Sequence, residues 1–103
     1  MFIVQVTFKD RAALAANRDA HIAWLREGSE AGVILAAGTV VPPATAVAAE
    51  GGVILAAGAN KSALVARLRQ APLITSGAAT AEIIELQLSF ADSRLAFLQP
   101  PKG

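Results

Sequence analysis

The chain has 103 residues, no cysteine and a single histidine, which excludes disulfides, thiolate chemistry and any multi-histidine metal site. Its nine lysines and arginines nearly balance its eight aspartates and glutamates, and neither sign forms a run, so the sequence offers no nucleic-acid surface. No apolar stretch approaches the roughly 18 residues of a membrane span, and we expect one small cytoplasmic domain that needs no metal or cofactor and binds no membrane.

The first half of the chain shows a strand pattern, a helix pattern and a second strand pattern. Residues 2 to 8 alternate between apolar and mixed positions, which predicts a strand. Asp10 suits the N-cap of a helix that continues to Gly32. The sequence GVILAAG follows at residues 32 to 38, where β-branched Val33 and Ile34 favour a short strand.

The second half repeats this order of elements. GVILAAG returns at residues 52 to 58, after a connection that Pro42 and Pro43 interrupt. Asn60 suits the N-cap of a helix that ends near Pro72, and PLITSGAA is expected to be a loop. Residues 81 to 90 alternate again, which predicts a last strand with one apolar face formed by Ile84, Leu86, Leu88 and Phe90.

The resulting order, βαββαβ, predicts a ferredoxin-like α+β fold with an antiparallel sheet. We interpret the two GVILAAG segments as its second and third strands, paired as neighbours, with Leu35 and Leu55 buried. A solenoid would need a third copy, which the chain lacks. We predict a single domain over residues 1–90 and a C-terminal tail over residues 91–103, whose apolar side chains are available to a partner.

One face of the predicted sheet is expected to lie free of helices, because both helices cover the same side. We expect that face to carry a mixed set of side chains on the outer strands: Ile3, Gln5, Thr7, Ile83, Glu85 and Gln87. Such a face is too apolar for open solvent and too polar for a dry core. A second copy packed against it would give a dimeric α+β barrel, as a homodimer or a multiple of dimers.

The single histidine, His21, is the main candidate for chemistry. On a helical projection it shares one stripe with Leu14, Arg18 and Leu25, near the inward side, whereas Trp24 is expected to be a packing anchor. One interpretation is a structural histidine bonded to a backbone carbonyl. The other is a proton-transfer group, its pKa held at or below about 6.5 by the Arg18 guanidinium. The pattern alone leaves both open.

A resemblance to a known family bears on this choice. The stretch NRDAHIAWLREGSEAGVILAAG resembles part of the YciI-like (YCII-related) family, whose members carry Arg-x-x-His on the first helix and then a strand ending in Ala-Gly. The matching residues are Arg18, His21, Leu25, Gly32 and Gly38. The segment APLITSG is similar to the family's Asp-Pro-aromatic-x-x-x-Gly segment, with Pro72 and Gly77 in step. The likeness extends to about residue 90.

The resemblance implies a dimeric α+β barrel with a pocket beside His21, and some members act on chlorinated aromatics through a His and an Asp. Here the Asp position is Ala71, the aromatic position is Leu73, and Thr39 replaces a frequent Pro after Ala-Gly. We expect His21 to be the general base of a lyase or isomerase near the dimer interface. Arg18 and Thr39 would bind a small aromatic or carboxylate substrate. The alternative is a non-catalytic dimer that binds a small ligand or serves as an accessory protein.

Overall fold

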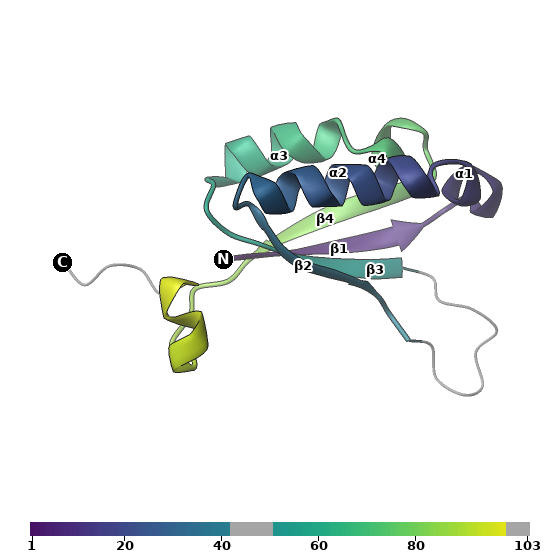
Figure 1. Cartoon of the computed structure of the whole chain (residues 1–103). Coiled ribbons are helices and arrows are strands. Elements are labelled where there is room, and N and C mark those ends of the chain that lie inside the picture. Colours follow the sequence, from purple (N-terminus) through teal and green to yellow (C-terminus); the bar gives the residue numbers. More distant parts are fainter. Residues whose placement is uncertain (42–50, 99–103) are drawn as a thin grey trace.

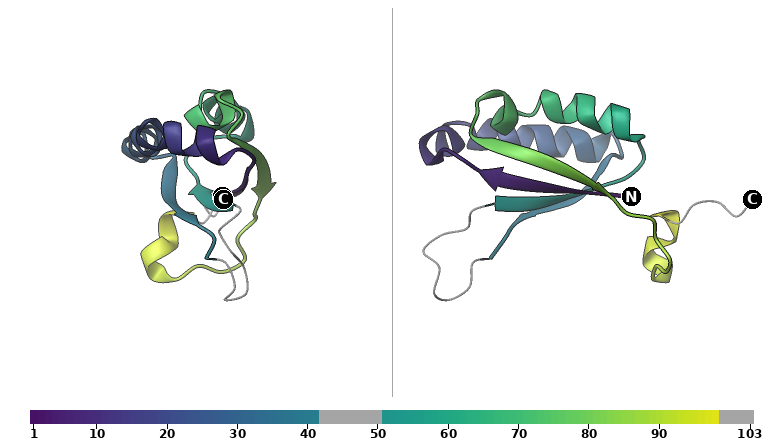
Figure 2. Two further views of the ribbon diagram at one scale, coloured as in Figure 1. Left: turned by 90° about the vertical axis from the view of Figure 1, so that its right-hand side faces the viewer. Right: turned by 180° about the vertical axis from the view of Figure 1, so that it is seen from behind.

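The computed structural model describes residues 1–41 and 51–98, and the connection with Pro42 and Pro43 lies outside them. Its four strands form one antiparallel sheet in the order β2-β3-β1-β4. Helices α1 to α4 form a single layer on one face of this sheet, and the opposite face carries none of them (Figures 1 and 2). The predicted ferredoxin-like α+β fold is confirmed.

The central strand of the sheet is β1, which pairs with β3 and β4, while β2 pairs with β3 at one edge. The two GVILAAG segments therefore lie in neighbouring antiparallel strands, as predicted. The strand bounds are β1 Phe2–Phe8, β2 Ile34–Thr39, β3 Gly51–Ala56 and β4 Ala79–Glu85. The last strand is shorter than predicted, since it ends at Glu85.

The predicted first helix is divided in two by a residue in its middle. The Asp10 carboxylate accepts hydrogen bonds from the backbone N–H groups of Ala12 and Ala13, which confirms the expected N-cap. At Asn17 the backbone leaves the helical region (φ −106°, ψ 9°), and a second helix starts at the next residue. The two helices are α1 Arg11–Ala16 and α2 Arg18–Glu30.

The second helical region also differs from the prediction at its end. Asn60 caps it as expected, because its side-chain oxygen accepts a hydrogen bond from the Ala63 N–H at 2.8 Å. The segment after Ala71, predicted as a loop, forms a short helix that begins at Pro72, where a missing N–H costs no helical hydrogen bond. The bounds are α3 Lys61–Arg69, α4 Pro72–Thr75 and the 3₁₀ helix η1 Ser93–Leu98.

The hydrophobic core lies between the sheet and the helical layer. Val4 and Leu64 are its most completely buried large side chains. Each such side chain contributes about 1.5–3 kcal/mol through its removal from water. Trp24 is a packing anchor, as predicted, since it is 8% exposed within this core. The main cluster consists of Phe2, Val4, Trp24, Val33, Ile34, Ile54, Ala56, Leu64, Leu68 and Ala71.

Helix α2 approaches the sheet most closely at Gly28. A Cβ atom at this position would meet the side chain of Ile34, the first residue of β2, so the close contact requires glycine. Gly32 then turns the chain from α2 into β2 with a positive φ of 77°. These two glycines set the distance and the reversal of direction between α2 and β2.

The strand register corrects the predicted composition of the sheet's helix-free side. Residues directly opposite each other share a face, and Ile84 stands opposite Ile3. Ile83 stands opposite Val4 and packs against the core, so the expectation that Ile83, Glu85 and Gln87 lie on the helix-free side is wrong. We call that side the open face; it consists of Ile3, Gln5, Thr7, Val53, Leu55, Thr80, Glu82 and Ile84.

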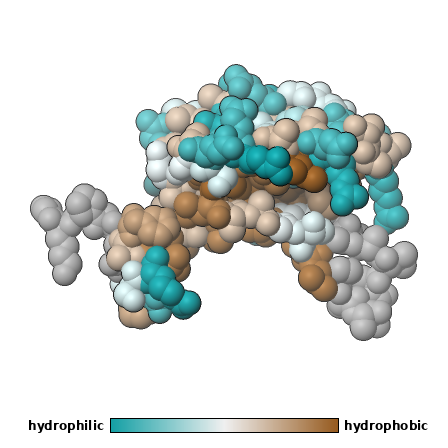
Figure 3. Space-filling view, in the orientation of Figure 1, coloured by the Kyte–Doolittle hydropathy of each residue, from teal (hydrophilic) through white to brown (hydrophobic). Residues whose placement is uncertain are grey.

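The prediction that Leu35 is buried is also wrong, because its side chain is 37% exposed. Leu35 lies at an irregularity where the register shifts between Ile34 and Ala36, and such a bulge turns a side chain out of the regular alternation. Leu55 is half-buried on the open face. Apolar groups are visible below the polar helical layer in the space-filling view (Figure 3).

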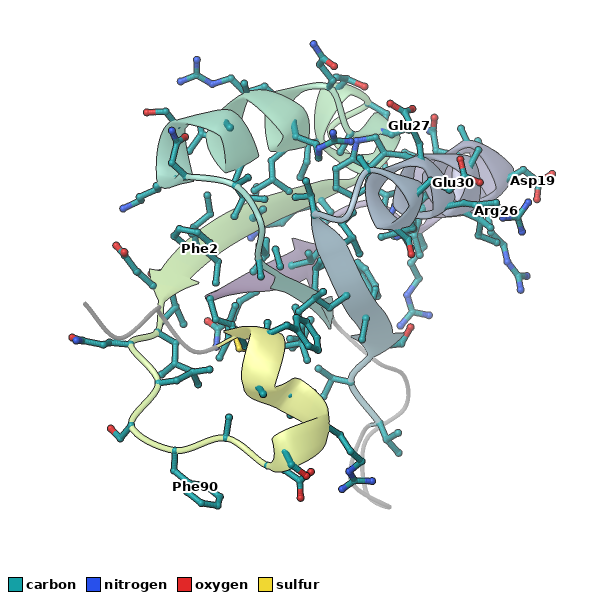
Figure 4. All side chains as sticks on the ribbon, turned by 60° about the vertical axis from the view of Figure 1, so that its left-hand side comes forward. Phe2, Asp19, Arg26, Glu27, Glu30 and Phe90 are labelled. Atoms are coloured by element: carbon teal, nitrogen blue, oxygen red, sulfur yellow. The ribbon has the colours of Figure 1, made fainter. Side chains whose placement is uncertain are left out.

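The chain beyond β4 carries exposed aromatic side chains. Phe97 in η1 is 68% exposed, and Phe90 projects away from the ribbon (Figure 4). This part of the chain extends below the sheet, on the side opposite the helical layer (Figure 1). Within the described ranges, no helix has the length and apolar character needed to cross a membrane.

Candidate functional site

The candidate site residues come from the beginning of α2 and the end of β2. Arg18 is the first residue of α2, His21 lies one turn later, and Thr39 is the last residue of β2. Because α2 and β2 run in opposite directions, the start of α2 and the end of β2 lie at the same end of the protomer (Figure 1). The fold therefore brings the three predicted residues to one region.

His21 is half-buried against its neighbour on the same helix. Its imidazole stacks on the indole of Trp24, with ring centroids 6.1 Å apart and ring planes inclined by 17°. The Nδ1 atom is buried and has no hydrogen-bond partner among the described residues. The structural interpretation expected a bond from this ring to a backbone carbonyl, and in the described part of the chain Nδ1 does not make one.

Burial also determines the charge of His21. Removal of the ring from water lowers the pKa of His21 from its ordinary value of 6.5, because desolvation disfavours the imidazolium. The direction agrees with the sequence-based expectation, but the cause is burial and not the Arg18 guanidinium. The imidazole is therefore neutral at pH 7, and protonation would leave a buried Nδ1–H without an acceptor.

Arg18 and Thr39 are both exposed. Among the residues that the structure describes, Arg18 takes part in no ion pair. It sits at the N-terminus of α2, where the helix dipole adds positive potential, although Asp19 in the same turn offsets part of it. The guanidinium is thus available to bind an anion within one helical turn of His21.

The residue at the family's aspartate position is part of the core. Ala71 is almost completely buried at the N-cap of α4, in the same cluster as Trp24. No group of three or more His, Cys, Asp or Glu side chains within the described ranges is arranged to hold a metal ion. The chemistry that this region offers is therefore proton transfer by a histidine that has no carboxylate at residue 71 to orient it.

Two surface grooves border the third helix. One lies between α2 and α3, where Trp24 forms part of the wall and Arg67 reaches Glu27 at 3.9 Å. The other lies between α3 and β4 and is mainly apolar. Neither groove contains His21, Arg18 or Thr39, but the first shares Trp24 with the histidine stack. The spacing of His21 and Trp24 on one helix face was visible in the sequence, whereas their stacking was not predicted.

Comparison with known proteins agrees with this fold. The family model of the YCII-related domain matches residues 1–87, which confirms the resemblance seen around His21. A solved structure is also similar: 5-chloro-2-hydroxyhydroquinone dehydrochlorinase (TftG) from Burkholderia phenoliruptrix AC1100, in complex with 2,5-dihydroxybenzoquinone. The similarity covers 84% of this chain and 93% of that chain, with a TM-score of 0.63 and 14% sequence identity, so it supports the fold alone. No curated protein matches the chain.

Proposed function

Because the chain belongs to the YCII-related domain family, we propose that it is a small-molecule enzyme of lyase or isomerase type in which His21 transfers a proton. The observation that carries the proposal is the environment of His21. The ring is half-buried, its pKa is lowered by burial, and it lies one turn from a cation that has no ion-pair partner in the described ranges. A neutral imidazole at pH 7 is able to act as a general base.

The proposed reaction is a proton transfer that needs no redox change. In an elimination, His21 takes a proton from the substrate, the released electron pair forms a double bond, and the leaving group departs as an anion. In an isomerisation, the imidazolium returns the proton to a different atom of the same substrate. Since burial disfavours the imidazolium, the protonated ring gives up its proton readily, which suits a group that must accept and donate in one cycle.

The proposed substrate is a small aromatic or carboxylate compound with an anionic oxygen. The Arg18 guanidinium presents paired N–H donors that match a carboxylate or phenolate. Thr39 adds a hydroxyl group from the end of β2 at the same end of the protomer. The 2,5-dihydroxybenzoquinone in the similar TftG structure is a ligand of this chemical class, which makes it a suitable probe.

The proposal includes a homodimer, or a multiple of dimers, that acts in the cytoplasm. Two open faces packed together would form an α+β barrel, with the site near the dimer interface. The composition of the face supports this arrangement, because partly exposed Ile3, Leu55 and Ile84 surround polar Gln5 and Glu82. Apolar side chains in such a contiguous patch are typical of an interaction surface.

A non-catalytic role is the second candidate, and Ala71 is the observation that favours it. The family's carboxylate is absent at this position, so the imidazole loses one determinant of its tautomer and pKa. In this case the same residues would bind the ligand without turning it over, as in a small-ligand-binding or accessory protein.

Binding and turnover of defined probes separate the two candidates. Calorimetry with 2,5-dihydroxybenzoquinone tests binding, and chloride release from 5-chloro-2-hydroxyhydroquinone tests elimination. The enzyme proposal expects chloride release that His21→Ala abolishes, and weaker probe binding in Arg18→Gln but not in the α3 control Arg69→Gln. Binding that depends on Arg18, without release of chloride, would favour the non-catalytic candidate. Binding that neither substitution changes would reject this site.

A further inference from the structure

We propose that Trp24 is the positioning residue of His21: it holds the imidazole so that Nδ1 faces the protein and Nε2 is the nitrogen that meets a ligand. The catalytic meaning of this arrangement rests on the proposed function. The orientation of the ring itself does not, since it follows from the packing of two side chains on α2.

The indole is suited to this role because it is fixed at its own position. Trp24 belongs to the main core cluster, where it is held together with Val33 of the following turn and Ala71 of the α4 cap. His21 and Trp24 are three residues apart on α2, a spacing that places two side chains on one helix face. A nearly parallel stack at 6.1 Å therefore transfers the rigidity of the core to the imidazole plane.

The two ring nitrogens have different surroundings as a result. Nδ1 is buried without a hydrogen-bond partner in the described part of the chain, whereas Nε2 is not among the buried unpaired atoms. A substrate proton therefore reaches Nε2 more easily than Nδ1. Since Nε2 lies at the far side of the ring from Cβ, this orientation also extends the reach of the base beyond the helix surface.

Charged groups do not explain this orientation. The elements that pack most extensively against α2 are α1, β2 and α4. Neither β2 nor α4 contains a titratable side chain, and α1 contributes only Arg11. On α2 itself, Asp19, Arg26 and Glu27 point away from the sheet (Figure 4), and Glu27 is paired with Arg67 of α3 at 3.9 Å. The aromatic stack is thus the contact that holds the ring.

The composition of the chain allows a direct test. It contains one tryptophan and one histidine, so Trp24 fluorescence reports on this pair without background. Because an imidazolium in contact with an indole quenches its emission, the wild-type protein should lose intensity in a single step as the pH falls below about 6.5. The step should be absent in His21→Asn. A wild-type protein without this step would overturn the proposal.

Nitrogen-15 NMR of the single histidine separates the roles of the two nitrogens. With 2,5-dihydroxybenzoquinone as probe, the Nε2 signal should shift and the Nδ1 signal should change far less. Trp24→Phe keeps a ring plane and should preserve this pattern, whereas Trp24→Leu should raise the pKa of His21 toward 6.5 and let both nitrogens respond. Where chloride release is measurable, Trp24→Leu should lower kcat roughly 10- to 100-fold and leave KM nearly unchanged.

The outcomes distinguish this inference from the proposed function. A fluorescence step and a Trp24-dependent pKa without probe binding would support the positioning of the ring and reject the enzyme proposal. Probe binding and turnover with the same His21 pKa and nitrogen shifts in folded Trp24→Leu would do the reverse. Should Trp24→Leu fail to fold, Trp24→Phe decides together with the wild-type titration, because loss of the Nε2 preference in that variant would also overturn the inference.

Discussion

Ile3 of β1 stands directly opposite Ile84 of β4 and, on its other side, opposite Leu55 of β3, so three large apolar side chains form one row across the open face. Gln5 and Glu82 form the next row beside it. A face with this composition exposes apolar area that water solvates poorly, and the row shows where a second copy would gain most by packing.

Thr7→Arg tests whether the open face is the dimer interface. Thr7 is exposed on this face, opposite Thr80 and Gly51. An arginine buried there between two sheets without a partner would cost several kcal/mol, so we expect the variant to lose the dimer. Light scattering should give twice 10.5 kDa, or a multiple, for the wild type and a smaller mass for the variant.

The control for this experiment lies on the helical side. Ser62 is exposed on α3, and Ser62→Arg adds the same charge away from the open face, so it should leave the mass unchanged. A wild-type mass of one chain at micromolar concentration would remove the barrel from the proposal.

Gly28→Ala tests the close contact between α2 and β2. The added methyl group would meet the Ile34 side chain, and overpacking of this kind typically costs about 1–3 kcal/mol. Urea denaturation should show that loss. Ala23→Ser on the exposed side of α2 is the control, and it should change the free energy of unfolding much less. Equal stability of Gly28→Ala and wild type would mean that α2 sits farther from the sheet.

Much of the fold was predictable because local signals and tertiary packing agree. Asp10 and Asn60 mark helix starts through side-chain caps that require no distant contact. The two GVILAAG segments are short, apolar and bounded by glycines, which favours strands in any antiparallel sheet. The break at Asn17 was missed because asparagine has no strong preference against a helix interior.

The errors in the sheet have a different physical origin. Adjacent Ile83 and Ile84 are both apolar, so alternation alone does not tell which of them faces the helices; the pairing with β1 decides it. The irregularity beside Leu35 depends likewise on pairing with β3. At the candidate site, helical spacing identified His21, but the burial of Nδ1 and the cause of the lowered pKa arise from packing around Trp24.

The lowered pKa of His21 makes a specific prediction for stability against pH. The folded protein holds the ring in a less basic state than the unfolded chain, whose histidine has the ordinary value of 6.5. The unfolded state therefore binds more protons as the pH falls through this value, and the free energy of unfolding decreases until the pH passes the folded pKa. Above about pH 7.5 the contribution disappears because both states are neutral.

Urea denaturation at a series of pH values checks this prediction with His21→Asn as the control. The difference in free energy of unfolding between wild type and variant should change between about pH 7.5 and 5, in the direction that favours the variant at low pH. A difference that does not depend on pH would show that the ring is as well solvated in the folded protein as in the unfolded chain.

His21→Ala should separate a chemical role from a structural one. A structural histidine bonded to a backbone carbonyl would cost about 1–3 kcal/mol on removal, because its partner would be left unpaired. In this structure Nδ1 has no partner in the described ranges, so removal of the ring leaves no such group behind, and only the stack on Trp24 is lost. We expect a melting temperature close to that of the wild type, together with loss of chloride release. Trp24→Ala, which removes a core side chain, should instead cost about 3–5 kcal/mol. A large drop in melting temperature for His21→Ala would make His21 a structural residue and favour the non-catalytic candidate.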